Sequence, residues 1–283
     1  MRINDRILCL VPWASGLRNF QSHESRVRSH IIFILLGFLI SGCTTEYNLA
    51  TQQQETLLYD TDKEIAMGDS ISQGVEKKYP PIEDVDLNER IERVLKRIVE
   101  VCDRTELVYF IKVLDDDMVN AISLPGGYVY IFRGLMDKLK TDDQLAAVIG
   151  HEIGHITAKH AVKKLQAAYG ALLVQAASYQ AGGGRVAQGV GLALASIFME
   201  HSQQDEFQAD RLGVKYMKKA GFNTQGMVDV IRILRKEQQR AEPHQFSYWR
   251  THPYLSQREA VVSQEIKGKM EYQEYIKLIG DSK

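Results

Sequence analysis

Apolar residues recur at helical spacing along much of the chain. Within Glu55 to Lys78 and Asp86 to Cys102 they fall three or four positions apart, which gives each segment one apolar and one polar face. In the second segment the apolar face contains Ile91, Val94, Leu95 and Ile98. Both segments are therefore predicted to be amphipathic helices.

Two short segments have the composition of buried strands instead. Leu107 to Leu114 and Tyr128 to Phe132 are rich in β-branched, aromatic and aliphatic side chains. Between them, residues 120–127 read Asn-Ala-Ile-Ser-Leu-Pro-Gly-Gly. This predicts a short strand that leads into a turn, since proline and glycine supply the dihedral angles that turns require. The pattern predicts an α+β fold that is predominantly helical and contains a small β-sheet.

A further helix is predicted to begin at Thr141, where Thr-Asp-Asp-Gln matches a capping box. Its apolar residues are Leu145, Ala146, Val148, Ile149, Ile153 and Ile156. Gly150 and Gly154 lie on one face of this helix, although each costs about 1 kcal/mol relative to alanine. We expect another element to approach the backbone closely at these two glycines.

The same helix carries the pattern H-E-x-x-H at His151, Glu152 and His155. Four residues advance a helix by about 400°, so both imidazoles leave one face a single turn apart and can bind one tetrahedral metal ion. Glu152 lies beside them, where it can reach a metal-bound water rather than the metal. The alternative, two exposed histidines on a helix, fits poorly with the apolar and glycine-containing surroundings.

The third ligand decides the class of metal site. The metzincin pattern requires glycine at position 158 and histidine at position 161, and both positions hold alanine. His160 follows His155 by five residues, about 140° around a continuous helix. We therefore expect His160 at the surface or among the neighbours of the ligands, and the third ligand elsewhere in the chain.

A second helical stretch, from His201 to Gly221, supplies candidates for that ligand. Glu206 and Asp210 are four positions apart, so their carboxylates point the same way. One can bind zinc while the other accepts the N–H of a ligand histidine. Alone, this spacing fits a solvated acidic face equally well, but after H-E-x-x-H it favours a shared zinc site.

The chain resembles the HtpX-type and CAAX-prenyl-endopeptidase-like zinc metalloproteases, which are gluzincins. The resemblance covers about residues 60 to 260 and depends on residues 120–131, residues 143–160, Glu206-Phe-Gln-Ala-Asp210, and Thr251-His252-Pro253 with Arg258. It implies a zincin-like fold with one zinc ion per chain. By this resemblance the zinc ligands are His151, His155 and Glu206, the general base is Glu152, and the acceptor behind a ligand histidine is Asp210.

The resemblance also implies contacts with a polypeptide substrate. The strand after Pro125 is expected to pair with an extended substrate, which makes Gly126, Gly127 and Tyr128 the candidate substrate-binding residues. His252 is expected near the metal, where it would stabilise the oxyanion or, as a fourth ligand, keep the enzyme latent. As a histidine before proline, it could also be a simple turn residue.

The N-terminal region indicates export. Residues 31–40 are an uncharged apolar run preceded by Arg26 and Arg28, which is the layout of a signal peptide. Ten residues are about half of what a membrane-spanning helix needs. Ile40-Ser-Gly-Cys43 resembles a bacterial lipobox, so we expect cleavage before Cys43 and lipidation of its thiol; the alternative is an uncleaved anchor or a buried segment.

These features predict the organisation of the chain. We expect a signal peptide over residues 1–42, a lipidated cysteine and polar tether over residues 43–56, and a single zinc metalloprotease domain over residues 57–283. Thr44, rather than aspartate, follows the candidate lipidated cysteine, which by resemblance to bacterial lipoproteins favours the outer membrane. Cys102 is then left without a disulfide partner and is expected to be a buried, unreactive thiol.

One apolar region separates the two helices of the site. Leu165 to Gly184 and Val186 to Met199 are uncharged and rich in alanine and glycine. Membrane-embedded relatives carry spanning helices here, but glutamines, three consecutive glycines and the shortness of the second piece make spanning improbable. A flap over the cleft and a helical hairpin in the core both remain open.

Composition limits the partners. With 35 Lys and Arg against 36 Asp and Glu, no excess positive charge is available for nucleic acid. By the family resemblance, the expected function is hydrolysis of unfolded or misassembled cell-envelope proteins at the periplasmic face of the outer membrane, beside the envelope assembly machinery. The alternatives are a non-proteolytic assembly factor with a closed zinc site, and a zinc hydrolase acting on envelope glycans or small peptides.

Overall fold

A computed structural model describes residues 44–168, 200–240 and 247–267. By internal contacts the chain divides into Met1–Thr44 and Thr45–Lys283, and everything below, apart from Thr44, lies in the second unit. The expected signal peptide, the candidate lipidation site Cys43 and most of the apolar segment 165–199 lie outside the described residues.

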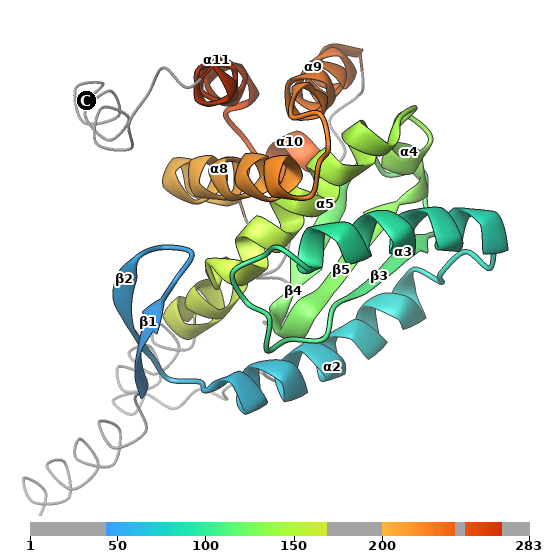
Figure 1. Cartoon of the computed structure of the whole chain (residues 1–283). Helices are drawn as coiled ribbons and strands as arrows, with labels where there is room; N and C mark the ends of the chain where they lie inside the picture. The colour runs from blue at the N-terminus through green and yellow to red at the C-terminus, as the bar shows by residue number, and fades with distance from the viewer. Residues whose placement is uncertain (1–43, 169–199, 241–246, 268–283) are drawn as a thin grey trace, which may run out of the picture. The chain divides into compact units, whose positions relative to one another are not determined.

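The described elements match most of the sequence pattern (Figure 1). The strands are β1 (Thr44–Asn48), β2 (Gln53–Leu57), β3 (Phe110–Leu114), β4 (Ala121–Leu124) and β5 (Tyr128–Phe132). The helices are α2 (Thr61–Lys78), α3 (Val85–Val99), α4 (Arg133–Met136), α5 (Asp142–Thr157), α8 (Gln203–Lys219), α9 (Gln225–Arg240), α10 (Tyr248–Thr251) and α11 (Leu255–Ile266). One boundary was wrong: residues 55–57 belong to β2, and the helix expected from Glu55 begins only at Thr61, after its N-cap Asp60.

The three-stranded sheet has the order β3-β5-β4. β3 runs parallel to β5 and β4 runs antiparallel to it, with Ala121 opposite Ile131. Successive residues of β5 face opposite sides of the sheet: Val129 and Ile131 join the core cluster that contains α3 and α5, while Tyr130 and Phe132 join the cluster that contains α2. The sheet is therefore covered by helices on both faces.

Helix α5 is the centre of the molecule, and its residues from Leu145 to Thr157 are all buried. Thr141 caps it by accepting from the backbone N–H of Gln144, as the capping box predicts. A Cβ on Gly154 would lie 2.7 Å from the carbonyl oxygen of Ala209, and one on Gly150 would lie 3.3 Å from the Cα of Gly213. The close approach expected at the two glycines is confirmed, and the approaching element is α8.

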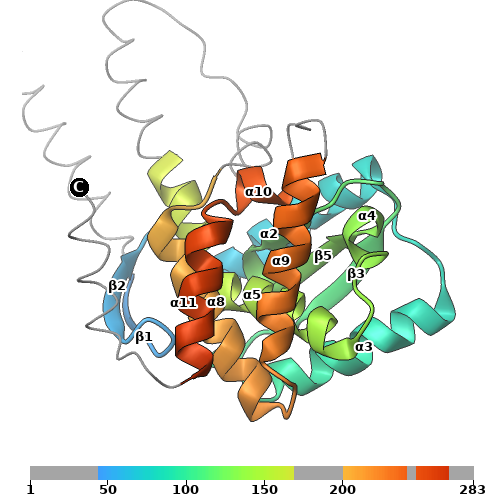
Figure 2. The same ribbon diagram turned by 90° about the horizontal axis from the view of Figure 1, so that it is seen from above.

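The remaining C-terminal helices complete this side of the core. Helix α9 packs against α5, and α11 packs against both α8 and α9 (Figure 2). The connection between α10 and α11 therefore passes close to α8, on the side of α8 that faces α5. This arrangement brings residues near position 252 to α5, although they are about 100 positions apart in the sequence.

The polar segment that the sequence assigns to a tether contains the two-stranded sheet β1-β2. The side chain of Asn48 donates to the carbonyl oxygen of Thr157, 3.0 Å away, at the end of α5. Lys159 forms an ion pair with Glu46. The segment after Cys43 is thus in contact with the end of α5. The domain boundaries themselves stay a prediction.

Two further expectations concern the described residues. Cys102 is buried, and burial raises the pKa of its thiol, in agreement with an unreactive cysteine. Within the described part of the chain, no helix has the length and apolar character needed to cross a membrane.

Candidate metal centre

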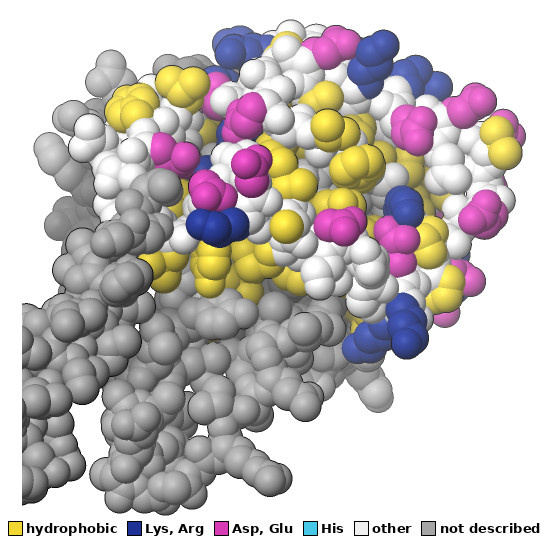
Figure 3. All heavy atoms as spheres, turned by 90° about the horizontal axis from the view of Figure 1, so that it is seen from below, with side chains coloured by type: hydrophobic (Ala, Val, Ile, Leu, Met, Phe, Trp, Pro, Cys, Tyr) yellow, Lys and Arg dark blue, Asp and Glu magenta, His cyan; other side chains and the backbone are white. Residues whose placement is uncertain are grey.

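The two histidines of the H-E-x-x-H motif point to one place. His151 and His155 leave α5 one turn apart, and their Nε2 atoms lie 3.0 Å from each other. Both side chains are almost fully buried, and on the face of the molecule in Figure 3 no histidine of the described residues is visible. The helical spacing of the motif therefore produces the convergence that the sequence predicts.

Helix α8 brings Glu206 to the same point. Ser202 caps α8 in a reciprocal capping box with Asp205, which fixes where the helix begins and so which residues face α5. The Glu206 Oε1 atom lies 3.4 Å from His155 Nε2, and its Oε2 atom lies 3.6 Å from His151 Nε2. The close packing at Gly154 allows this carboxylate to reach the imidazoles.

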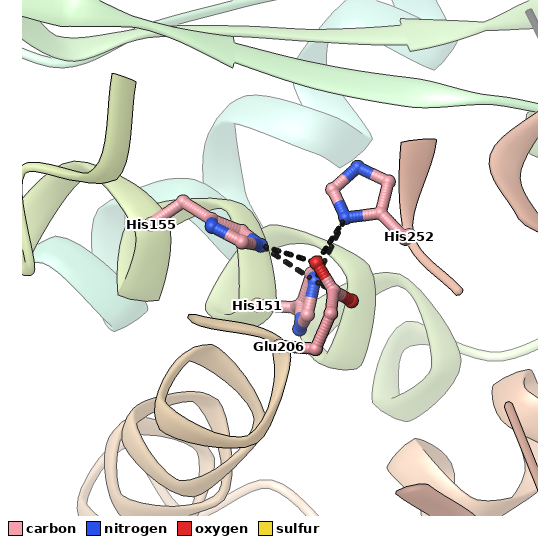
Figure 4. Close-up of side chains that lie close together, drawn as sticks. All are labelled: His151, His155, Glu206 and His252. Atoms are coloured by element: carbon pink, nitrogen blue, oxygen red, sulfur yellow. Dashed lines mark hydrogen bonds and ion pairs between the residues drawn. The ribbon is translucent and has the colours of Figure 1, made fainter. Parts of the chain in front are cut away.

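His252, which follows α10, completes a group of four (Figure 4). Its Nδ1 atom is 3.0 Å from Glu206 Oε1 and 3.4 Å from His151 Nε2, and the ring of Tyr248 stacks on it at 4.4 Å. Ligand atoms placed tetrahedrally around zinc at 2.0–2.1 Å lie about 3.3 Å from one another. Five distances between ligand atoms of these residues, 3.0 to 3.6 Å with both oxygens of Glu206 included, are compatible with such an ion.

Glu152 provides a second test of the fit. Its side chain is fully buried, and neither carboxylate oxygen has a hydrogen-bond partner among the described residues. The nearest ionisable group in contact is His252, whose Nε2 is 3.7 Å away. A buried carboxylate without a partner is costly, so the arrangement indicates that a water molecule or another polar species belongs beside Glu152.

Asp210 and Arg258 form the support behind these residues. His151 Nδ1–H donates to Asp210 Oδ1 at 2.8 Å, which leaves His151 Nε2 free to bind a metal. Arg258 donates to both Asp210 oxygens at 2.8 Å and lies 2.6 Å from Glu206 Oε2. Asp210 thus lies where the sequence predicts; the contacts of Arg258 were not predicted, because no local spacing relates it to α8.

The protonation states suit a cation. Burial lowers the pKa of His155 well below its ordinary value, and the neighbouring histidines lower it further. Burial opposes ionisation of Glu206, but His252 and Arg258 outweigh it and hold the pKa of Glu206 below its usual range. Arg258 likewise outweighs burial and lowers the pKa of Asp210. Neutral imidazole and ionised carboxylate are the forms that bind zinc.

A second histidine group adjoins the first. Of the two positions expected for His160, the structure shows the one among the neighbours of the ligands: the side chain is buried and its Nδ1 lies 2.8 Å from His155 Nδ1. The ring of His201 lies 4.0 Å from the ring of His155, centroid to centroid. His155, His160 and His201 together form another set of atoms close enough to hold a metal. The part played by His201 was missed, since a histidine just before a helix carries no distinctive sequence signal.

The strand expected to pair with a substrate is already paired on both sides. Strand β5 is central and pairs with β3 on one side and β4 on the other, so it has no free edge for a substrate. Gly126 packs against α2, where an added Cβ would lie 2.9 Å from Ile65 Cα. The backbone at Gly127 similarly meets the carbonyl of Val108. These glycines are explained by close packing, with φ of 78° and 101°.

Comparison with known proteins identifies a family for this chain. The model of peptidase family M48 matches residues 86–266, which span the sheet, α5, α8 and His252. The chain is 27% identical to a beta-barrel assembly-enhancing protease of Yersinia pestis over 61% of this chain and 38% of that protein. It is 33% identical to the mitochondrial metalloendopeptidase OMA1 of Schizosaccharomyces pombe, over 47% of this chain and 40% of that protein.

A third relative is the metalloprotease LoiP of Escherichia coli, 32% identical over 50% of this chain and 56% of that protein. The matched part of the chain thus spans between about a third and just over half of the length of these relatives. The family match confirms the resemblance inferred from the motifs and the α+β zincin-like fold that it implies. The chain belongs to peptidase family M48.

Proposed function

We propose that this chain is a zinc-dependent metalloendopeptidase, with His151, His155 and Glu206 as metal ligands and Glu152 as general base. The observation that supports this most strongly is the buried carboxylate of Glu152, which has no hydrogen-bond partner among the described residues and lies beside converging imidazole and carboxylate atoms. The ionised carboxylates of Glu206 and Asp210 give this cluster negative charge, which favours a bound cation.

The residues have separate tasks in peptide hydrolysis. A bound zinc ion would polarise the scissile carbonyl and lower the pKa of the attacking water. Glu152 takes the proton of that water and delivers it to the leaving amine. Asp210 keeps His151 in the tautomer that presents Nε2, and Arg258 fixes one oxygen of Glu206 so that the other faces the imidazoles.

His252 could stabilise the oxyanion or act as a fourth ligand, and its position in this structure favours the fourth ligand. Its Nδ1 lies at the fourth corner of the ligand set, where a water molecule would otherwise bind, so this arrangement corresponds to a closed site. Cleavage then requires His252 to leave that corner, after which it can donate to the oxyanion. The same position supports the second candidate function, a latent or non-proteolytic assembly factor.

An extended substrate is best accommodated along β4. This strand pairs with β5 on one side, and among the described strands nothing pairs with its other side. It packs against α5, and an added peptide strand would gain main-chain hydrogen bonds there. We propose β4 in place of the strand after Pro125 as the substrate-binding edge.

The substrates and location follow from the relatives and the N-terminal sequence. Because one relative is named a beta-barrel assembly-enhancing protease, we propose unfolded or misassembled cell-envelope proteins as substrates and contact with their assembly machinery. The basic and apolar N-terminus with Ile40-Ser-Gly-Cys43 supports a lipid anchor at Cys43 in the outer membrane, facing the periplasm. Mass spectrometry of the mature N-terminus tests the anchor.

The proposed activity is tested by metal analysis and degradation of unfolded casein. The wild type should contain one zinc ion per chain and degrade casein, and Glu152→Gln should keep the zinc and lose cleavage. Cleavage retained in Glu152→Gln would refute the mechanism, and zinc without any cleavage in wild type would favour the assembly factor. His252→Ala separates its two roles, since loss of a latch raises cleavage and loss of an oxyanion donor lowers it.

A further inference from the structure

The two ligand histidines of α5 are supported by different groups. Behind His151 stands a carboxylate, that of Asp210. Behind His155 stands a third imidazole, because His155 Nδ1 and His160 Nδ1 are 2.8 Å apart. A hydrogen bond between two ring nitrogens requires one of them to carry the proton and the other to offer its lone pair.

The surroundings of His160 decide which nitrogen is which. Its other nitrogen, Nε2, lies 2.9 Å from the side-chain oxygen of Gln208 and 3.4 Å from Asp205 Oδ1. Both oxygens only accept, so Nε2 carries the hydrogen and donates it. In the neutral ring Nδ1 is then an acceptor, and the proton between the two rings belongs to His155 Nδ1.

We propose that His160, backed by Gln208, is a positioning residue that holds His155 in the tautomer with a free Nε2 facing the metal. His155 Nε2 is the atom that lies 3.0 Å from His151 Nε2 and 3.4 Å from Glu206 Oε1. The inference rests on the proposed metal site. It adds to that site a relay from Gln208 through His160 to His155.

The backbone is built to make this contact. Helix α5 ends at Thr157, and Lys159 adopts the left-handed conformation, with φ of 57°, before helical structure resumes at residue 160. This break turns His160 back towards His155, although five residues along an unbroken helix would carry it about 140° away. In this conformation the backbone N–H of Lys159 donates to the carbonyl oxygen of Ile156, and its side chain forms an ion pair with Glu46.

Helix α8 provides the polar groups behind both ligand histidines. Asp210 accepts from His151 directly, and Gln208 accepts from His160. The two supports differ in charge: a carboxylate raises the basicity of its histidine more than a neutral imidazole does. Replacing the relay should therefore affect the tautomer of His155 without adding or removing a formal charge.

The alternative is a second metal held by His155, His160 and His201. It would require His155 to bind ions at both nitrogens and so to lose its N–H. The 2.8 Å between the two Nδ1 atoms is also an ordinary hydrogen-bond distance. The hydrogen bond is therefore the better explanation.

The test uses the full chain and measures zinc affinity by competition with a chromogenic chelator. His160→Leu removes the acceptor, whereas His160→Asn keeps an acceptor oxygen near the position of Nδ1. Val162→Ala, at a buried residue of the same helical turn, is the control for lost packing. In the metal-free wild type, the ¹⁵N shifts of the His155 ring report which nitrogen is protonated.

We expect His160→Leu to weaken zinc binding by about 10- to 100-fold, and His160→Asn and Val162→Ala to bind like the wild type. The ring shifts should show a protonated Nδ1 in His155. Unchanged affinity in folded His160→Leu, two zinc ions in the wild type, or an unprotonated Nδ1 would each overturn the relay. A wild type that binds no zinc would overturn the proposed function as well, so failure of the relay can be distinguished from failure of the proposed function. If His160→Leu does not fold, the ring shifts of the wild type still test the relay.

Discussion

Arg258 offers the sharpest test of how the site is held together. Its side chain is 1% exposed and makes a two-pronged pair with Asp210, while its third nitrogen lies against Glu206. Arg258→Met keeps much of the volume but removes the charge. The buried carboxylates of Asp210 and Glu206 would then both lose the guanidinium group that pairs with them.

The size of the effect follows from that burial. Removing one partner of a buried ion pair costs about 3–5 kcal/mol, because the remaining charge is left uncompensated. For a domain of this size this corresponds to a fall in Tm of about 6–20 °C. Urea unfolding in EDTA, followed by circular dichroism, measures the loss without any contribution from bound metal.

A double-mutant cycle shows whether the loss comes from the orphaned charge. Asp210→Asn neutralises that carboxylate yet keeps an oxygen that accepts from His151. The double variant should therefore be more stable than the sum of the single losses predicts, by about 0.5–3 kcal/mol. If Arg258→Met loses less than about 1 kcal/mol, or if the two losses add, the pair does not have the role assigned to it.

Three other predictions test separate parts of the structure. Glu152→Gln should retain zinc and reduce casein cleavage by about 10²- to 10⁴-fold, the usual contribution of a general base. Gly154→Ala should lower the free energy of unfolding by about 1–3 kcal/mol through overpacking against Ala209, and Gly150→Ala, with a nearest contact of 3.3 Å, should lose less. In the metal-free folded protein, burial lowers the pKa values of three histidines, His155, His160 and His201, so their rings stay neutral. In the unfolded chain the same histidines take up protons below about pH 6.5. The free energy of unfolding in EDTA should therefore fall, by up to about 4 kcal/mol per pH unit, as the pH drops below that value.

Each of these has an outcome that would contradict it. Loss of zinc in Glu152→Gln would make that residue a ligand rather than a base. Equal stability of the two alanine variants would mean that α8 does not approach α5 as described. A free energy of unfolding that is flat from about pH 7 to 5 would mean that the three rings are protonated alike in both states.

Much of this site could be predicted because its spacing is local. Helical periodicity alone places His151 and His155 on one face, and likewise Glu206 and Asp210. The same periodicity places Gly150 and Gly154 on one face and so predicts a closely packed neighbour there. Strand order is different, since it depends on pairings between distant segments. The composition of Tyr128 to Phe132 shows a buried strand but not that the strand is central, so it could not show which strand of the sheet has a free edge.

His160 shows where periodicity itself fails. The expectation of a residue 140° off the metal-facing side is correct for a continuous helix, and the error lies in assuming continuity through Lys159. A left-handed conformation at a residue with a Cβ costs about 1–3 kcal/mol and persists only where its surroundings hold it. The surroundings of Lys159 include the carbonyl oxygen of Ile156, which accepts from its backbone N–H, and Glu46, far away in the sequence; the next residue, His160, contacts His155. Because the helix break involves contacts with residues distant in the sequence, the sequence around Lys159 left open whether His160 would lie at the surface or beside the ligands.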